Sequence, residues 1–330
     1  MKTEIKNLDK LVLVNLDIDI WSGQAKLQAS DLKRISVEDL PPESLASLGS
    51  KRLCNKEHLK VFSKLKTRAN RAVMDHGRPF LGGYAYPSDR IQELEGRLII
   101  IEQEYLEAKR QFLNRYDQAV EDWITENPDY AEAIRAGALT RAEVAERLNF
   151  GFQIINIQPT ESPEAQSRLK KSVQGVGDAL VDEIADRANE FFEKYLVGAE
   201  QVSTQTKRTL KNMRDKVSGM AFLNGNLLPM EQLLDEMLRG YSVHQGKKHV
   251  TGEDFNRILA ATLILSDRNK LERYTSGDLS LENLLSSMSG NKKEEEKPEQ
   301  QEQSSASSES VEAPATTATD GDSEEEDYFF

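Results

Sequence analysis

The stretch Ile91–Trp123, IQELEGRLIIIEQEYLEAKRQFLNRYDQAVEDW, decides the fold, because its apolar residues keep a helical period over about nine turns. Steps of three and four residues alternate along it, which is the heptad spacing of a helix that buries one continuous seam. Asn127–Pro128 ends the pattern. The sequence therefore predicts one long helical arm. Its seam consists of Ile91, Leu94, Leu98, Ile101, Tyr105, Ala108 and Phe112, continued after one slip by Tyr116, Ala119 and Trp123.

A second apolar stripe runs from Ala165 to Tyr195 and predicts a second long arm. Ser162 and Pro163 provide the N-cap and the first helical residue. Each arm of roughly thirty residues would be about 45 Å long. Two such arms predict an antiparallel coiled-coil hairpin. A heptad arm can equally pair between chains, so a homo-oligomer through the coiled coil stays open.

A small β element is expected at the base of this hairpin. In LVLVNLDIDIW, Leu11–Trp21, apolar residues alternate with Asn15, Asp17 and Asp19, which is the period of a half-buried strand. The run FGFQIINIQP, residues 150–159, is its predicted partner.

The remaining regions differ sharply in composition. Residues 203–285 keep helical patterns, whereas the chain from Ser286 on consists of Lys, Glu, Gln, Ser, Ala and Thr without apolar periodicity, which is typical of disorder. We therefore predict a mainly α protein with a long antiparallel coiled-coil hairpin, a small β element, a helical C-terminal region and a disordered acidic tail. Its predicted divisions are residues 1–160, 161–285 and 286–330.

Charge separates a nearly balanced body from an acidic end. The formal net charge of the 330 residues is −13. Residues 291–330 hold ten Glu, three Asp and three Lys, a net charge of −10, which leaves −3 for residues 1–290. The acidity of the whole chain therefore does not exclude a polyanionic partner for its body.

The N-terminus and the cysteine content favour a reduced, cytoplasmic setting. The apolar run within Met1–Trp21 is interrupted by Asp and Asn, unlike a secretory signal, and no stretch approaches the roughly 20 apolar residues of a membrane span. Cys54 is the single cysteine, so an intramolecular disulfide is excluded. We expect a cytoplasmic protein with no membrane partner.

Catalytic and metal-binding signals are weak. The four histidines share no helical face with paired carboxylates, and CNKEH provides only half a metal site in Cys54 and His58. The glycines of FLGGY lack the Lys and Ser/Thr of a phosphate loop. We therefore expect no enzymatic activity, no metal and no cofactor.

The most basic stretch is SKRLCNKEHLKVFSKLKTRANRA, Ser50–Ala72. On a helix, the cations that recur every four residues from Lys56 to Arg68 form one stripe, although like charges at this spacing cost a few tenths of a kcal/mol per pair. Contact with a polyanion would offset that cost. A solvated face, or a seat for the chain's own acidic tail, explains the same pattern. The predicted nucleic-acid-binding cations here are Lys51, Arg52, Lys56, Lys60, Lys64, Lys66, Arg68 and Arg71.

The loop GRPFLGGYAYP, Gly77–Pro87, adds aromatic residues to this basic region. Phe80, Tyr84 and Tyr86 stand near Arg78, and aromatics beside cations stack on unpaired bases with about 1–3 kcal/mol per base. These four residues complete the predicted site and suggest single-stranded DNA as its partner. The alternative is that the aromatics pack beneath adjacent helices.

The chain ends in DGDSEEEDYFF, with six carboxylates between Asp320 and Asp327 and then three aromatics. Asp327, Tyr328, Phe329 and Phe330 are predicted to dock in a pocket on another protein, with the acids against a basic rim. The tip resembles that of the single-stranded-DNA-binding proteins of bacteria and some phages, although it lacks their DIPF ending. That resemblance implies a replication or recombination protein as the partner. A plain solubilising tail is the alternative.

The body resembles an uncharacterised bacterial and phage family, the domain of unknown function DUF3150. The stretches that carry the resemblance are LDIDIWSGQAKLQASDL, LGSKRL, FLGGYAYP, FLNRYDQAVEDWI followed by NP, and FGFQIINI. It covers about the first two hundred residues and implies no chemistry. It does imply a setting in phages and integrative elements, near genes for a MoxR-type AAA+ ATPase and a von Willebrand-A-domain protein.

Together these features predict a phage or mobile-element accessory protein of DNA metabolism. It would bind single-stranded nucleic acid through its basic helix and recruit replication or recombination partners through its tail. The alternative is a non-enzymatic adaptor or scaffold for a MoxR-type AAA+ ATPase and its von Willebrand-A partner.

Overall fold

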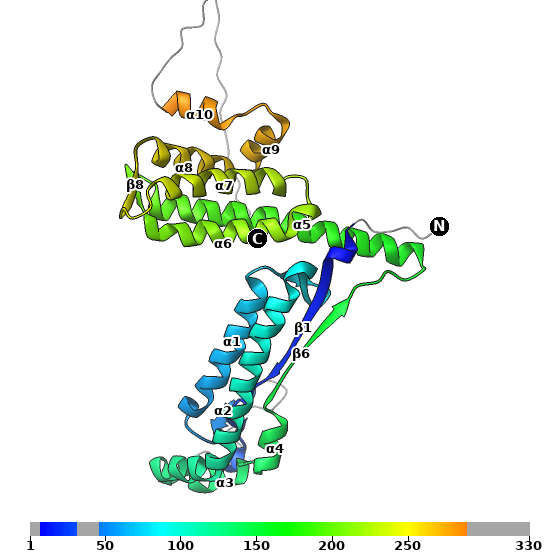
Figure 1. The fold of residues 1–330 in the computed structure, drawn as a ribbon. Helices are drawn as coiled ribbons and strands as arrows, with labels where there is room; N and C mark the ends of the chain where they lie inside the picture. Colours follow the sequence, from blue (N-terminus) through cyan, green and yellow to red (C-terminus); the bar gives the residue numbers. More distant parts are fainter. Residues whose placement is uncertain (1–6, 32–45, 289–330) are drawn as a thin grey trace, which may run out of the picture. The chain divides into compact units, whose positions relative to one another are not determined.

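Paired long helices lie along a small antiparallel sheet, and the later helices pack against one another in a bundle (Figure 1). The structure, a computed structural model, describes residues 7–31 and 46–288. By their contacts, Met1–Gly290 form one unit. The helices are α1 (Lys60–Met74), α2 (Ile91–Glu126), α3 (Ala131–Gly137), α4 (Arg141–Glu146), α5 (Pro163–Tyr195), α6 (Lys207–Met220), α7 (Leu227–Val243), α8 (Gly252–Leu265), α9 (Arg268–Ser276) and α10 (Leu281–Met288).

The main sheet has four antiparallel strands in the order β4-β5-β1-β6. Two small ribbons pair β2 with β3 and β7 with β8. The strands are β1 (Leu11–Asp19), β2 (Gln24–Lys26), β3 (Ser50–Arg52), β4 (Arg78–Phe80), β5 (Gly83–Pro87), β6 (Asn149–Asn156), β7 (Gln201–Ser203) and β8 (His249–Thr251).

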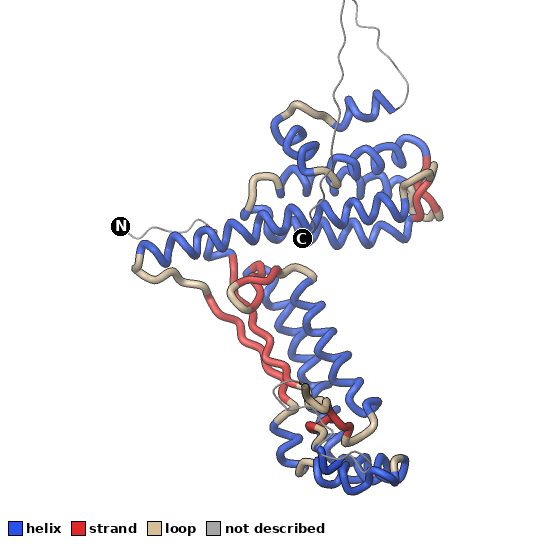
Figure 2. The backbone as a smooth tube through the Cα atoms, turned by 180° about the vertical axis from the view of Figure 1, so that it is seen from behind, coloured by secondary structure: helices blue, strands red, loops and turns tan. Residues whose placement is uncertain are grey.

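The pairing of β1 with β6 confirms the predicted contact between two strands far apart in the sequence. The register runs from Val12 opposite Asn156 to Asp19 opposite Asn149. Figure 2 shows the two strands as an extended red ribbon beside the paired helices. Val12, Val14 and Ile18 are buried on the helix side, as the alternation predicted.

The long helix predicted from Ile91 is present as α2, and the mainly helical class with a small sheet is confirmed. The expected partner of α2 is corrected. Its seam packs against α1 and the sheet, and α5 is not among its main contacts. A heptad seam specifies that an apolar partner exists, not which one. Here α1 supplies it through Phe62, Leu65, Ala69, Ala72 and Val73.

The second predicted arm is present as α5, and it begins as its sequence indicated. Ser162 caps it by accepting a hydrogen bond from the backbone N–H of Ala165, and Pro163 is its first residue. A capping box of Thr140 and Glu143 begins α4. The apolar stripe of α5 faces α8 and α6, within the helical bundle.

Two hydrophobic cores result. One lies between α1, α2 and the sheet, and the other lies within the bundle of α5 to α10. Leu11, Phe80 and Ala85 belong to the bundle core although they lie in the sheet. The strands thus tie the two cores together within one unit. The predicted tail, with its docking residues Asp327 to Phe330, lies outside the described residues.

Candidate nucleic-acid interface

The basic stretch forms a short 3₁₀ turn, η4 (Lys56–Leu59), followed by α1. Asn55 accepts a hydrogen bond from the backbone N–H of Glu57 and so starts this turn. Lys56 therefore precedes the α-helix, and the predicted four-residue stripe cannot begin there. This is the first correction to the predicted interface.

Three of the predicted cations are held by other parts of the protein. The Lys51 ammonium lies 2.7 Å from a carboxylate oxygen of Asp31, and both side chains are largely buried. Lys66 donates to the backbone carbonyl of Ile18 at 2.6 Å. Arg68 forms a two-pronged pair with Glu104 of α2, at 2.7 and 2.6 Å. These side chains fasten elements together, which reduces their availability to phosphates.

Three other cations form a continuous exposed face. Lys60, Lys64 and Arg71 are exposed, and their spacing of four and seven residues places them on one side of α1. Lys60 also pairs with Glu57 at 2.7 Å, but both groups are more than half exposed, so the pair is weak. We call Lys60, Lys64 and Arg71 the basic face of α1. Arg52 and Lys56, also exposed, precede it in the chain.

The aromatic loop is a tight hairpin of β4 and β5, and it does not present its aromatics to solvent. Phe80 lies in the bundle core and Tyr86 in the other core. Tyr84 is half-buried, and its hydroxyl bonds to the Asn70 side chain at 3.1 Å. The prediction that Phe80 and Tyr86 stack on bases is corrected, because the two cores bury their rings.

Arg78, the last predicted site residue, belongs to an ionic cluster that is mostly buried except for Arg187. The Glu183 carboxylate pairs with Arg78, with Lys216 at 2.8 Å and with Arg187 at 2.7 Å. Lys216 also donates to the carbonyl of Met74 at 2.9 Å. We call Arg78, Glu183, Arg187 and Lys216 the ionic cluster. It joins the end of α1 and β4 to α5 and α6.

The ionic cluster carries more positive than negative charge. One carboxylate faces three cations, and the Lys216 side chain has no exposed surface. Burial, together with the charges of Arg187 and Arg78, lowers the pKa of Lys216 to about 7. Burial likewise lowers the pKa of Arg78. A change in the charge of Lys216 would therefore affect the contacts that join the end of α1 and β4 to α5 and α6.

Sequence reasoning missed Glu183 and Lys216. The segment KRTLKNMRDK, residues 207–216, has the charge pattern of an ordinary exposed helix face. One signal was present, because Lys216 lies three residues after Met213 and four before Met220, both buried. A lysine inside an apolar stripe is expected to need a buried counter-charge.

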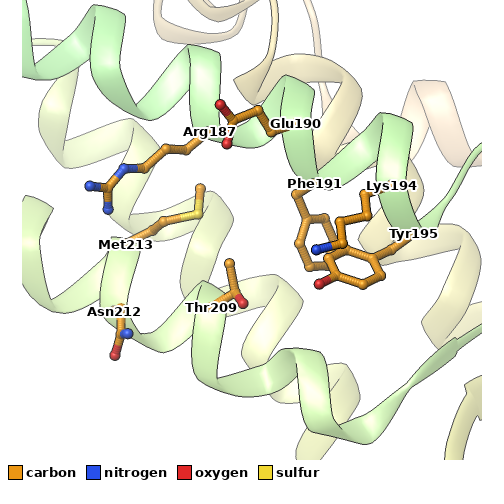
Figure 3. A pocket seen from close by; sticks show the side chains of 8 residues that line it. All are labelled: Arg187, Glu190, Phe191, Lys194, Tyr195, Thr209, Asn212 and Met213. Atoms are coloured by element: carbon orange, nitrogen blue, oxygen red, sulfur yellow. The ribbon is translucent and has the colours of Figure 1, made fainter.

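A pocket of about 330 Å³ opens between α5 and α6 (Figure 3). Its apolar part is Phe191 and Met213, and Arg187 links it to the ionic cluster. At its other end the Lys194 ammonium lies 5.2 Å from the centre of the Tyr195 ring. The lining contains no Cys or His. Its residues are Arg187, Glu190, Phe191, Lys194, Tyr195, Thr209, Asn212 and Met213.

Metal sites and membrane spans were also sought in residues 7–31 and 46–288. These residues contain no group of three or more His, Cys, Asp or Glu arranged to hold a metal ion. Across the same ranges, no helix combines the length and hydropathy that crossing a membrane requires. Cys54 is buried, and burial raises the pKa of its thiol to about 11.

Comparison with known proteins gives one result. No curated protein and no solved structure matches the chain significantly. The profile of a family described as "Protein of unknown function (DUF3150)" matches residues 8–267, which include the basic face of α1 and both cores except Leu271 and Leu281 of the bundle core. The match covers well over half of the chain, and so the protein belongs to the DUF3150 family.

Proposed function

We propose that this protein is a non-enzymatic, cytoplasmic accessory factor of DNA metabolism in a phage or mobile element. Its body contacts the phosphate backbone of nucleic acid through the basic face of α1. Its acidic, aromatic-ended tail recruits a replication or recombination protein. The observation that supports this proposal best is the exposure of Lys60, Lys64 and Arg71 on one side of a well-anchored helix.

The geometry narrows the kind of binding. Lys60 and Arg71 are eleven residues apart, so the basic face is about 16 Å long and matches a short run of phosphates. Because Phe80 and Tyr86 are buried, base stacking contributes nothing to this contact. We therefore propose backbone binding without base readout. Base stacking therefore does not contribute to the predicted preference for single-stranded DNA.

A salt series tests the proposal. Binding of a labelled single strand, measured by fluorescence anisotropy, should weaken with salt with a log–log slope of about −2, as expected for three phosphate contacts. Lys64→Ala should make that slope shallower by about 0.7. Lys170→Ala, which removes an exposed lysine from α5, serves as the matched control and should leave the slope unchanged.

Single-stranded and duplex DNA should bind with similar affinity, since each aromatic stack would otherwise add about 1–3 kcal/mol in favour of the single strand. Absence of binding to either at low salt would remove the nucleic-acid proposal. An equal effect of Lys64→Ala and Lys170→Ala would show that general charge, and not the basic face, binds the DNA.

The second candidate is an adaptor or scaffold for a MoxR-type AAA+ ATPase and a von Willebrand-A partner, with no nucleic acid. One observation favours it. Exposed apolar residues, Ile99 and Leu106, lie on α2 away from its core seam. Binding through such a surface would show little dependence on salt, so the same series separates the two candidates.

A further inference from the structure

The two edges of the main sheet differ in how they are protected. β4 is a three-residue edge strand that contains Pro79, and both features discourage pairing with another strand. β6, the other edge, has eight residues, NFGFQIIN, without a charge or a proline. Among the described residues only β1 pairs with it. An edge of this kind is a ready template for one more strand.

The helices above the sheet leave room for that strand. α1 lies against β1 and β5, and α2 lies against β6. Packed helices are about 8–10 Å apart and paired strands about 4.8 Å apart, so two helices cover four strands. α1 and α2 cover β5, β1 and β6. A strand added beside β6 would thus be the fourth strand under these two helices. It would lie beneath the outer side of α2.

The outer side of α2 has the character of an interface. Lys109 marks the flank of α2 nearest β6, because its ammonium donates to the carbonyl of Leu148 at 2.6 Å. Leu106 lies one turn from Lys109 on that flank, and Ile99 lies seven residues earlier. Their side chains are 51% and 40% exposed. A strand beside β6 would cover part of this apolar surface.

The carboxylate of Glu102 makes this surface favour a basic residue on the added strand. Glu102 lies between Ile99 and Leu106 on the helix, is half-buried, and has no ion-pair or hydrogen-bond partner among the described residues. A Lys or Arg on the added strand, facing α2, would pair with it. The surface therefore suits an extended segment with alternating apolar residues and one basic residue on its inner face.

A second copy of this chain fits less well. If β6 of one copy paired with β6 of another in a continuous sheet, each α2 would occupy the position beneath the other. The two helices would then be about 5 Å apart, below the 8–10 Å that packed helices need. A single strand without its own helix avoids this collision.

We propose that β6 and the outer side of α2 form a docking site for an extended segment of another protein, which adds a fifth strand to the sheet. Backbone hydrogen bonds to β6 provide affinity, and the surface of Ile99, Glu102 and Leu106 provides selectivity. This site is separate from the basic face of α1 and goes beyond the proposed function.

A displayed library of random dodecapeptides, selected on the full chain, tests the proposal. Enriched peptides should show apolar residues at every second position, with Lys or Arg at one inward position. A labelled peptide from this set should lose about tenfold or more in affinity on Leu106→Lys or Ile99→Lys, because one aliphatic contact is lost and the new lysine competes with the peptide's basic residue for Glu102. Binding should also protect from hydrogen exchange the β6 amides that face away from β1.

Ile100→Lys is the matched control. It places the same charge on the same helix, but Ile100 is 54% exposed and lies on the flank of Glu104, which faces α1. It should change affinity by about twofold at most. Circular dichroism verifies that each variant is folded.

Three outcomes would overturn the proposal. These are no enrichment above the unselected library, peptides whose binding is equally sensitive to Ile100→Lys and Leu106→Lys, and protection, already in the free chain, of the β6 amides that face away from β1. Self-association abolished by Leu106→Lys, seen by sedimentation, would assign the surface to a second copy instead.

Discussion

At the scale of single residues, the ionic cluster is the most consequential arrangement. Lys216 is fully buried, and its stabilising partners are the Glu183 carboxylate and the carbonyl of Met74. Burying an ammonium costs several kcal/mol unless it is well paired, and here three cations share one carboxylate. The charge on Lys216 is therefore less favourable in the folded state than in the unfolded chain.

This imbalance predicts a pH dependence of stability. The pKa of Lys216 is about 7 in the folded protein, below its ordinary value of 10.5. The unfolded chain then binds more protons between these values, so the free energy of unfolding should rise with pH from about 7 to about 10.5. Lys216→Met should flatten this rise and be neutral or stabilising at pH 7, by about 1–4 kcal/mol. Urea denaturation of the wild type and of Lys216→Met, at pH 7 and in the upper part of this pH range, measures the change in the free energy of unfolding.

Glu183→Gln, in the same cluster, should have the opposite effect on stability from Lys216→Met. It leaves three cations without their shared counter-charge and should destabilise the protein by about 3–5 kcal/mol. An identical pH slope for the wild type and Lys216→Met would contradict the assignment of this dependence to Lys216.

At the scale of elements, the heptad helix α2 shows how one seam can serve two partners. Leu98 and Tyr105 are fully buried, and the Tyr105 ring lies 5.0 Å from Phe62 of α1 and 5.4 Å from Phe150 of β6. Ion pairs flank the contact between α1 and α2, through Arg68 with Glu104 and Arg97 with Asp75. Because these pairs are exposed, most of the stability comes from the aromatic and aliphatic seam.

Two side-chain truncations on α2 should therefore differ widely in their effect on the free energy of unfolding. Leu98→Ala should cost about 2–5 kcal/mol, since Leu98 is completely buried and its removal leaves a cavity. Leu106→Ala should change the free energy of unfolding by about 0.5 kcal/mol or less, because Leu106 is half exposed. Chemical denaturation followed by circular dichroism compares them. Similar costs would mean that the outer side of α2 is covered in solution.

At the scale of the whole molecule, charge is divided unequally along the chain. Residues 291–330 carry −10, whereas residues 1–290 carry −3 and include the basic face of α1. An acidic segment tethered to a cationic face competes with nucleic acid for it and lowers the affinity at low salt.

A chain that stops at Gly290 should therefore bind a single-stranded oligonucleotide more tightly than the full chain. The difference should shrink as salt is raised, because screening weakens the competition. Fluorescence anisotropy on both chains measures the change. Equal affinities at low salt would exclude competition by the tail, and the recruiting role of Phe329 and Phe330 would then need a test of its own.

Local sequence patterns predicted the elements well. The alternation of Val12, Val14 and Ile18, the seam of α2, and the start of α5 at Ser162 and Pro163 were all readable, because each depends on neighbours within a few residues. The pairing of β1 with β6 was also readable, since few other β-rich runs compete for it.

The sequence by itself determined the long helices α2 and α5, the strands β1 and β6, and how charge is distributed along the chain, whereas it did not place the start of α1 or the hairpin of β4 and β5. The tertiary structure decided which apolar faces meet, so that α2 packs on α1 and not on α5. It also decided that Phe80 and Tyr86 are buried, that Arg68 faces Glu104, and that Lys216 meets Glu183. The physical reason is that helical and strand periods are local, whereas an apolar surface is non-directional and does not identify its partner.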